Sequence, residues 1–118
     1  MKESIVQKKS FKFSLKIIDL YKNLERENEY IISKQILRSG TSIGANIEEA
    51  LAGQSRKDFI AKMAISSKEA RETKYWLCLL KESKLTSLNV DDLMDDIFEL
   101  IRMLTSIVKT SQQSLTKN

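Results

Sequence analysis

Apolar and small residues recur at alternating intervals of three and four positions in four separate stretches of the chain. The most regular stretch is the last, where the repeating positions are Val90, Leu93, Ile97, Leu100, Leu104 and Ile107. Intervals of three and four place side chains on one face of an α-helix. Each stretch therefore predicts a helix with one face in a hydrophobic core.

The same pattern gives the core faces of the other three predicted helices. In the first helix this face comprises Phe13, Ile17, Leu20 and Leu24. In the second helix it comprises Ile36, Gly40, Ile43, Ile47 and Ala50. In the third helix it comprises Phe59, Met63, Ser66, Ala70, Thr73, Leu77 and Leu80.

Three further packing features are predicted from these faces. The residues expected to widen the core face of the first helix are Phe11, Ile18 and Tyr21. The small middle of the third helix is expected to face the glycines of the second helix, which would bring two antiparallel backbones close together. Asn46 lies at the edge of the core face, and its amide is expected to form a hydrogen bond to another helix.

Residues that commonly begin or end helices set the predicted boundaries. Ser10 and Asn89 are predicted caps of the first and fourth helices, and Ser55 begins a capping box at the third. Gly53 is predicted to stop the second helix by adopting the left-handed conformation. The helices are predicted at about residues 10–26, 30–52, 55–84 and 90–111, after a frayed basic lead over residues 1–9.

The composition agrees with an entirely helical chain. The 118 residues include no proline and only three glycines, and a domain commonly contains roughly 100 to 150 residues. We therefore predict a single domain over residues 1–118. Long helices joined by short loops favour an all-α fold, an antiparallel up-down-up-down four-helix bundle.

The sequence lacks residue types on which many enzymes and metal sites depend. It has no histidine, and Cys78 is its only cysteine, which excludes Ser-His and Cys-His nucleophile pairs and a cysteine zinc cluster. Gly40 and Gly44 form a GxxxG spacing and not a phosphate-binding loop. We predict no catalytic, cofactor-binding or metal-binding residues and no enzymatic activity. Without an apolar run of about 20 residues or a signal-peptide core, a cytoplasmic protein that makes no membrane contact is expected.

Basic residues recur on the faces of two predicted helices. The chain has 20 basic and 16 acidic residues, a net charge of +4 and a pI of about 9.2. The candidates for contacting nucleic-acid phosphates are Lys8, Lys9, Lys12, Lys16, Lys68, Arg71, Lys74, Lys81 and Lys84. Ordinary solvated lysines explain the same residues, and the composition leaves both interpretations open.

Two predicted helices have a second line of residues on the side away from the core. The candidates for contacts between subunits of a homo-oligomer are Arg38, Ser42, Ala45, Glu49, Ile65, Tyr75, Trp76 and Leu79. A fully solvated helix face would carry longer and more charged side chains, which favours the oligomer interpretation. The alternative is that these residues belong to a wide apolar face on a helix central to the bundle.

Two segments of the chain carry a family resemblance. SGTSIGANIEEA over residues 39–50 and SRKDFIAKMAISSKEARETKYWLCLL over residues 55–80 closely resemble the bacterial four-helix-bundle proteins of 23S ribosomal RNA intervening sequences. Weaker similarity in FKFSLKIIDLYKNL and ELIRMLTSIVKT extends the resemblance over nearly the whole chain. Gly44 stands where many members have proline, so the resemblance implies no proline kink at this position.

The resemblance also implies partners. The family is similar to the accessory variability determinant of diversity-generating retroelements, a homopentamer that binds nucleic acid and partners a reverse transcriptase. For the present chain this implies a pentamer with basic surfaces and no enzymatic activity. The predicted function is therefore that of a non-enzymatic oligomeric bundle that binds RNA or DNA. The alternative is a protein-interaction adaptor, for example a partner of a reverse transcriptase, with no direct role on nucleic acid.

Overall fold

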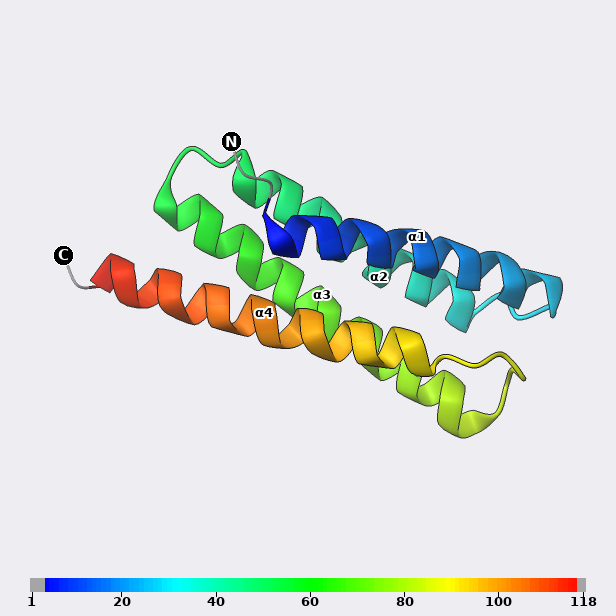
Figure 1. The fold of residues 1–118 in the computed structure, drawn as a ribbon. Coiled ribbons are helices and arrows are strands. Elements are labelled where there is room, and N and C mark those ends of the chain that lie inside the picture. The colour runs from blue at the N-terminus through cyan, green and yellow to red at the C-terminus, as the bar shows by residue number, and fades with distance from the viewer. Residues whose placement is uncertain (1–3, 117–118) are drawn as a thin grey trace.

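Residues 4–116 are described by the computed structural model, and they form four helices in an up-down-up-down bundle (Figure 1). The helices are α1 (Ile5–Arg26), α2 (Ile32–Leu51), α3 (Arg56–Ser83) and α4 (Asp91–Thr116). Figure 1 shows α1 beside α2, α3 beside α4, and the start of α1 and the end of α4 at the same end of the bundle. The predicted all-α fold and its topology are confirmed. Among the described residues, no helix is both long enough and apolar enough to span a membrane.

The first helix begins more than a turn earlier than predicted. Ser4, not Ser10, is the N-cap, and its hydroxyl accepts a hydrogen bond from the backbone N–H of Gln7 at 3.3 Å. Ser10 is buried and donates a hydrogen bond to the Gln7 carbonyl at 3.0 Å. The prediction of a frayed lead is wrong for residues 5–9, because Val6 adds another buried turn to the helix. Residues 1–3 of that lead lie outside the described residues.

The caps of the third and fourth helices are confirmed. The Ser55 hydroxyl accepts a hydrogen bond from the backbone N–H of Asp58 at 3.1 Å. The side-chain oxygen of Asn89 accepts one from the backbone N–H of Asp91 at 2.8 Å. The fourth helix continues to Thr116, beyond its predicted end, and Ser111 adds a buried position there.

The left-handed residue predicted at Gly53 lies elsewhere. Among residues 4–116 no glycine has a positive φ, and the left-handed positions are Asn28 (φ 64°) and Lys84 (φ 58°). The chain leaves α2 through Ala52, which keeps right-handed dihedral angles. The prediction for Gly53 is therefore wrong, and Lys84 instead provides a left-handed end to α3.

Glu29 caps the start of α2 in place of a serine or asparagine. Its carboxylate accepts hydrogen bonds from the backbone N–H groups of Ile32 at 3.0 Å and Ser33 at 2.8 Å. Burial raises the pKa of this carboxyl, but the hydrogen bonds from Ser33 and Ile32 outweigh burial and leave the pKa below its ordinary value. The bound carboxylate also lies at the positive end of the helix dipole.

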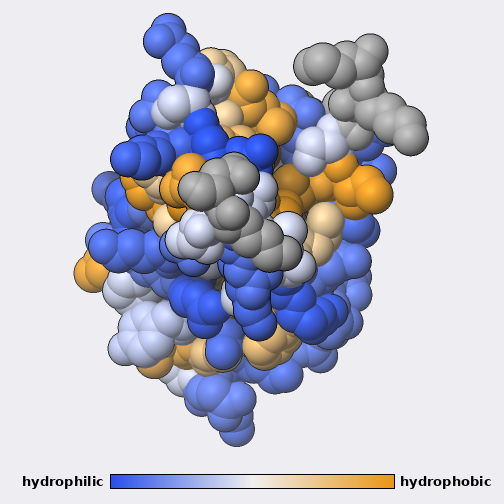
Figure 2. Space-filling model, turned by 90° about the vertical axis from the view of Figure 1, so that its left-hand side faces the viewer, coloured by the Kyte–Doolittle hydropathy of each residue, from blue (hydrophilic) through white to orange (hydrophobic). Residues whose placement is uncertain are grey.

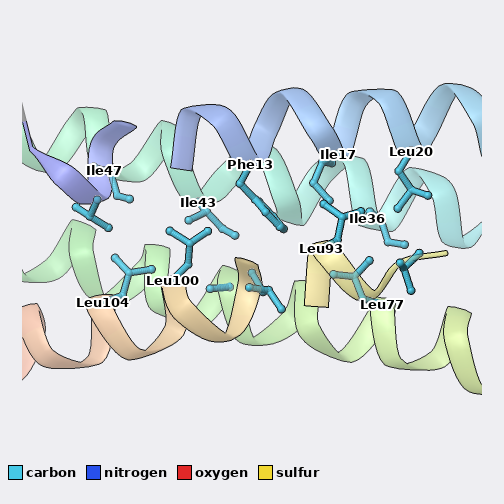
Figure 3. Close-up of a cluster of buried hydrophobic side chains, with 14 of the residues drawn as sticks. Phe13, Ile17, Leu20, Ile36, Ile43, Ile47, Leu77, Leu93, Leu100 and Leu104 are labelled. Carbon is cyan, nitrogen blue, oxygen red and sulfur yellow. The ribbon is translucent and has the colours of Figure 1, made fainter. Parts of the chain in front are cut away.

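Most of the predicted core positions are confirmed, as Figure 3 shows for residues from all four helices. Every predicted core position of α2 is buried, and the predicted faces of α3 and α4 are buried except for Phe59 and Ile107, which are half-buried. The prediction is wrong for Phe11, which is 63% exposed, and for Ile18, which is 37% exposed. They lie on the side of α1 away from the buried Phe13 and Ile17, so the bundle has no room for a wider face there.

The small residues fit between helices differently from the prediction. A Cβ atom at Gly40 would lie 2.9 Å from Ile17, so this glycine faces α1 and not α3. The small residues of α3 do approach α2, where the Ser66 hydroxyl donates to the Ile43 carbonyl at 2.8 Å. The Asn46 amide donates to the Ser42 carbonyl of its own helix at 2.8 Å, so the predicted bond to another helix is wrong.

Candidate nucleic-acid and self-association surfaces

The acidic start of α4 neutralises part of the predicted basic surface. Lys9 of α1 forms an ion pair with Glu99 at 3.2 Å, and Lys16 forms one with Asp96 at 2.7 Å. The hydrogen bond from Asp96 raises the pKa of the Lys16 ammonium. These two lysines, which were predicted to contact phosphates, therefore join α1 to α4 instead.

A third candidate, Lys81, is engaged in the same way at the other side of α4. It forms an ion pair with Asp91 at 2.9 Å, and this hydrogen bond raises its pKa. Both partners are exposed, so the pair contributes little to stability. The acidic run thus pairs with lysines from α1 and from α3, in addition to complementing the helix dipole.

The other six candidate cations form no ion pair within the described part of the chain. Lys8 and Lys12 are exposed on α1 and line one hollow with the exposed Phe11. The remaining four are Lys68, Arg71, Lys74 and Lys84. The structure therefore distributes the unpaired candidates over α1, α3 and the residue that follows α3, and does not gather all nine in one place.

Two of these four cations contact α4. The Arg71 guanidinium donates a hydrogen bond to the Thr105 hydroxyl at 3.0 Å. The Lys74 ammonium lies 5.2 Å from the centre of the Phe98 ring, which is a cation–π contact. Both cations therefore lie along the boundary between α3 and α4.

Lys57 and Lys109 also lie along this boundary and were absent from the predicted set. Lys57 lines one hollow between α3 and α4, and Lys109 lines the adjoining hollow with Arg71. The two lysines belong to different helices, 52 positions apart in the sequence. No spacing within one helix could have indicated that their hollows adjoin, because this depends on how α3 and α4 align.

Four of the predicted interface residues interact within their own subunit. Arg38 donates to Glu69 at 3.3 Å and also to Glu72, and the Trp76 indole donates to Glu72 at 2.9 Å. Glu49 forms an ion pair with Lys62 at 2.9 Å. The half-buried Ser42 donates to the Arg38 carbonyl at 2.7 Å. These contacts join α2 to α3 or stay within one of these two helices.

The remaining predicted interface residues are exposed. Tyr75 is 58% exposed, and Ile65 and Leu79 on the same outer face of α3 are 41% and 37% exposed. Ala45 is exposed on α2. The α3 line, which we define as Ile65, Tyr75 and Leu79, thus presents apolar side chains to solvent.

A second exposed apolar line was missed on α1. The α1 line comprises Phe11, Leu15 and Ile18, at intervals of four and three on the side of the helix away from the core. The regular spacing was visible in the sequence, but it does not say whether apolar residues face a core or a partner. Figure 2 views one end of the bundle, where apolar patches alternate with hydrophilic surface.

The described residues contain no cluster of three or more cysteine or acidic side chains arranged to hold a metal ion. Cys78 is half-buried on α3. Fold and surface together define a four-helix bundle with charged faces and two exposed apolar lines.

Comparison with known proteins assigns this bundle to a family. Residues 2–106 match the family model described as 23S rRNA-intervening sequence protein, and the chain belongs to this family. It is also similar to a crystal structure of a protein with unknown function from the S23 ribosomal protein family of Bacteroides thetaiotaomicron. The two chains are 49% identical with a TM-score of 0.85, and the match covers 92% of the present chain and 99% of the other. No significant match was found among curated proteins.

Proposed function

We propose that the protein is a non-enzymatic, self-associating bundle that binds RNA or DNA through its basic surfaces. The observation that carries the nucleic-acid part is the division of the cations. Three of the nine predicted residues pair with acids of α4, and the other six form no ion pair among the described residues. Cations without a carboxylate partner remain able to contact phosphates and to release their counterions.

Self-association is supported by the α1 line and the α3 line. A closed ring of identical subunits uses two different surfaces of each subunit, which meet head to tail. Phe11 and Tyr75 are the most exposed residues of their lines and lie on different helices of the bundle. The proposed pentamer rests on these two lines and on the family resemblance.

A binding measurement at two salt concentrations tests the nucleic-acid part. Labelled RNA and DNA oligonucleotides are titrated with the protein at about 50 mM and about 200 mM salt. If six phosphates are contacted, affinity should fall by about three orders of magnitude between the two conditions. No binding at about 50 mM salt would count against a nucleic-acid role, because phosphate contacts are strongest there.

Light scattering on a pair of tyrosine variants tests the self-association part. Tyr75→Glu places a charge on the α3 line and is expected to lower the measured mass towards the 13.6 kDa of one chain. Tyr30→Glu is the matched control, because Tyr30 is 49% exposed but lies in the connection between α1 and α2. A wild-type protein that is already monomeric at micromolar concentration would refute self-association.

The second candidate function is a protein-interaction adaptor, for example for a reverse transcriptase. The α1 line supports it, because exposed apolar residues in a row suit a polypeptide partner better than a phosphate backbone. The oligonucleotide titration distinguishes the two functions. An adaptor without a nucleic-acid role should fail to bind oligonucleotides at low salt, and Phe11→Glu should then abolish capture of the purified partner enzyme.

A further inference from the structure

A groove runs between the first half of α3 and the second half of α4. It consists of two adjoining hollows of about 290 and 470 Å³ that share Gln112. We call it the α3–α4 groove and define it by Lys57, Ser67, Arg71, Thr105, Lys109 and Gln112.

The α3–α4 groove carries positive charge that its own walls leave uncompensated. Arg71, Lys109 and Lys57 line it, and none of the described residues lining either hollow is an aspartate or a glutamate. At the opposite end of the same helix pair the charge is cancelled, because Lys81 is paired with Asp91. The groove therefore has no acidic residue among its described lining, whereas the other end of the boundary carries paired charges.

The cations follow the axis of the groove. Lys57 and Arg71 lie fourteen positions apart on α3, which corresponds to about 21 Å along a helix. Lys109 lies within four positions of both Thr105 and Gln112 on α4, so it sits between the two ends. Arg71 is held over the groove by its hydrogen bond to Thr105 at 3.0 Å. Positive charges spaced along a line match the repeating charges of one nucleic-acid strand.

The width and the floor of the groove favour a single strand. The axes of packed helices lie about 8 to 10 Å apart, whereas the major groove of DNA alone is about 12 Å wide. A duplex could rest only on the rims of the groove, but one strand can lie within it. The floor includes Ile60, Val108 and Leu115, whose apolar surface suits bases and sugars better than a fully hydrated duplex exterior.

We propose that the α3–α4 groove binds a short stretch of single-stranded RNA or DNA, with Arg71, Lys109 and Lys57 on its phosphates. This inference rests on the proposed nucleic-acid function and names the place and the form of the ligand. The exposed Lys8 and Lys12 on α1 then contribute only to the general attraction of polyanions.

Two double variants with the same change in charge test the inference. Arg71→Gln/Lys109→Gln removes two positive charges from the groove, and Lys8→Gln/Lys12→Gln removes two from α1. The probe is a fluorescein-labelled single-stranded RNA of mixed sequence, about 20 nucleotides long so that it exceeds a typical site. Fluorescence anisotropy gives its affinity from about 50 to about 200 mM salt.

The expected effect follows from counterion release. The logarithm of the affinity falls with the logarithm of the salt concentration, with a slope of about −0.7 per phosphate contact for a single strand. One contact therefore raises the affinity about eightfold at 50 mM salt relative to 1 M salt. The groove variant should therefore bind roughly sixty-fold more weakly than wild type at 50 mM salt, with a salt slope smaller by about 1.4. The α1 variant should lose less than about threefold, with little change of slope.

The outcomes separate this inference from the proposed function. If wild type fails to bind the RNA, the nucleic-acid function itself is refuted. If wild type binds but the α1 variant loses as much as the groove variant, or a duplex of the same sequence binds more tightly, the groove assignment is wrong. Equal competition by polyglutamate of matched charge would identify the groove as an acidic-peptide site and also overturn it.

Folding and assembly are checked alongside binding. Circular dichroism and light scattering should give wild-type unfolding midpoints and masses for both double variants, since all four side chains are exposed. Lys57→Gln/Lys109→Gln provides a second groove variant that leaves the Arg71–Thr105 bond intact. Wild-type affinity in this variant would likewise contradict the groove assignment.

Discussion

Replacing Gly40 with alanine tests how closely α1 and α2 pack. A Cβ atom there would lie 2.9 Å from both γ carbons of Ile17, whereas carbon atoms in contact are most favourable at about 3.5 to 4.0 Å. Ile17 is fully buried, and a β-branched residue in a helix has one strongly preferred rotamer. The added methyl group must therefore separate the two helices by about half an ångström.

The expected change in unfolding free energy for Gly40→Ala is the difference between two opposing effects. Overpacking a tight core contact costs about 1 to 3 kcal/mol. Alanine in a helix interior is more favourable than glycine by about 1 kcal/mol. Gly40→Ala should consequently lower the free energy of unfolding by about 1 kcal/mol, and Tm by about 4 °C in a chain of this size.

Gly44→Ala is the matched control, one helical turn further along α2. A Cβ atom there would lie 3.4 Å from the Ser10 hydroxyl and 3.6 Å from the Ser14 hydroxyl, which are ordinary contact distances. This variant gains helix propensity without a clash, so it should be more stable than wild type by up to about 1 kcal/mol.

Urea and thermal unfolding, followed by circular dichroism, measure both glycine variants. Each protein is studied at several concentrations, because self-association makes the midpoint depend on concentration. Opposite signs are expected for the two substitutions. A Gly40→Ala protein as stable as wild type or more stable would refute the predicted clash with Ile17.

Three further substitutions have defined outcomes. Glu29→Gln should lower stability by about 1 kcal/mol at neutral pH. Because folding lowers the pKa of Glu29, its carboxylate stabilises the fold above pH about 4.3, and this contribution disappears as the pH falls through the folded-state pKa. Wild type and variant should therefore converge in stability in acid-unfolding titrations. Ser66→Ala loses the buried hydrogen bond to the Ile43 carbonyl and should cost about 1 kcal/mol in urea unfolding. Lys16→Met breaks the exposed pair with Asp96 and should change stability by less than about 1 kcal/mol, with a larger loss indicating that the pair is more than a surface contact.

Hydrophobic periodicity was sufficient to predict the four helices and most of the core. Leu93, Leu100 and Ile47 are buried as expected because a three-four interval has one geometric meaning within a helix. The helix ends were less predictable. Ser4 and Ser10 are equally suitable caps by residue type, and only the burial of Val6 favours the earlier start.

Contacts between helices depend on their relative alignment, which the sequence pattern does not contain. The glycine spacing in α2 indicated close packing correctly, but it did not show that Gly40 faces Ile17 of α1. The exposure of the α1 line was unpredictable for the same reason, since Phe11 shares the three-four spacing of core residues although it is exposed. The grouping of Lys57 with Lys109 likewise requires the alignment of α3 with α4.

The acidic residues at the start of α4 make the two ends of the bundle differ in charge. Asp96 and Glu99 pair with lysines of α1, and Asp91 pairs with Lys81 of α3, so three cations near this half of α4 are neutralised. The second half of α4 carries Arg102 and Lys109 but no acidic residue beyond Glu99. A polyanion approaching the boundary of α3 and α4 is therefore repelled at one end and attracted at the other. The uneven placement of acidic residues, more than the modest net charge of +4, is what would direct a strand into the α3–α4 groove.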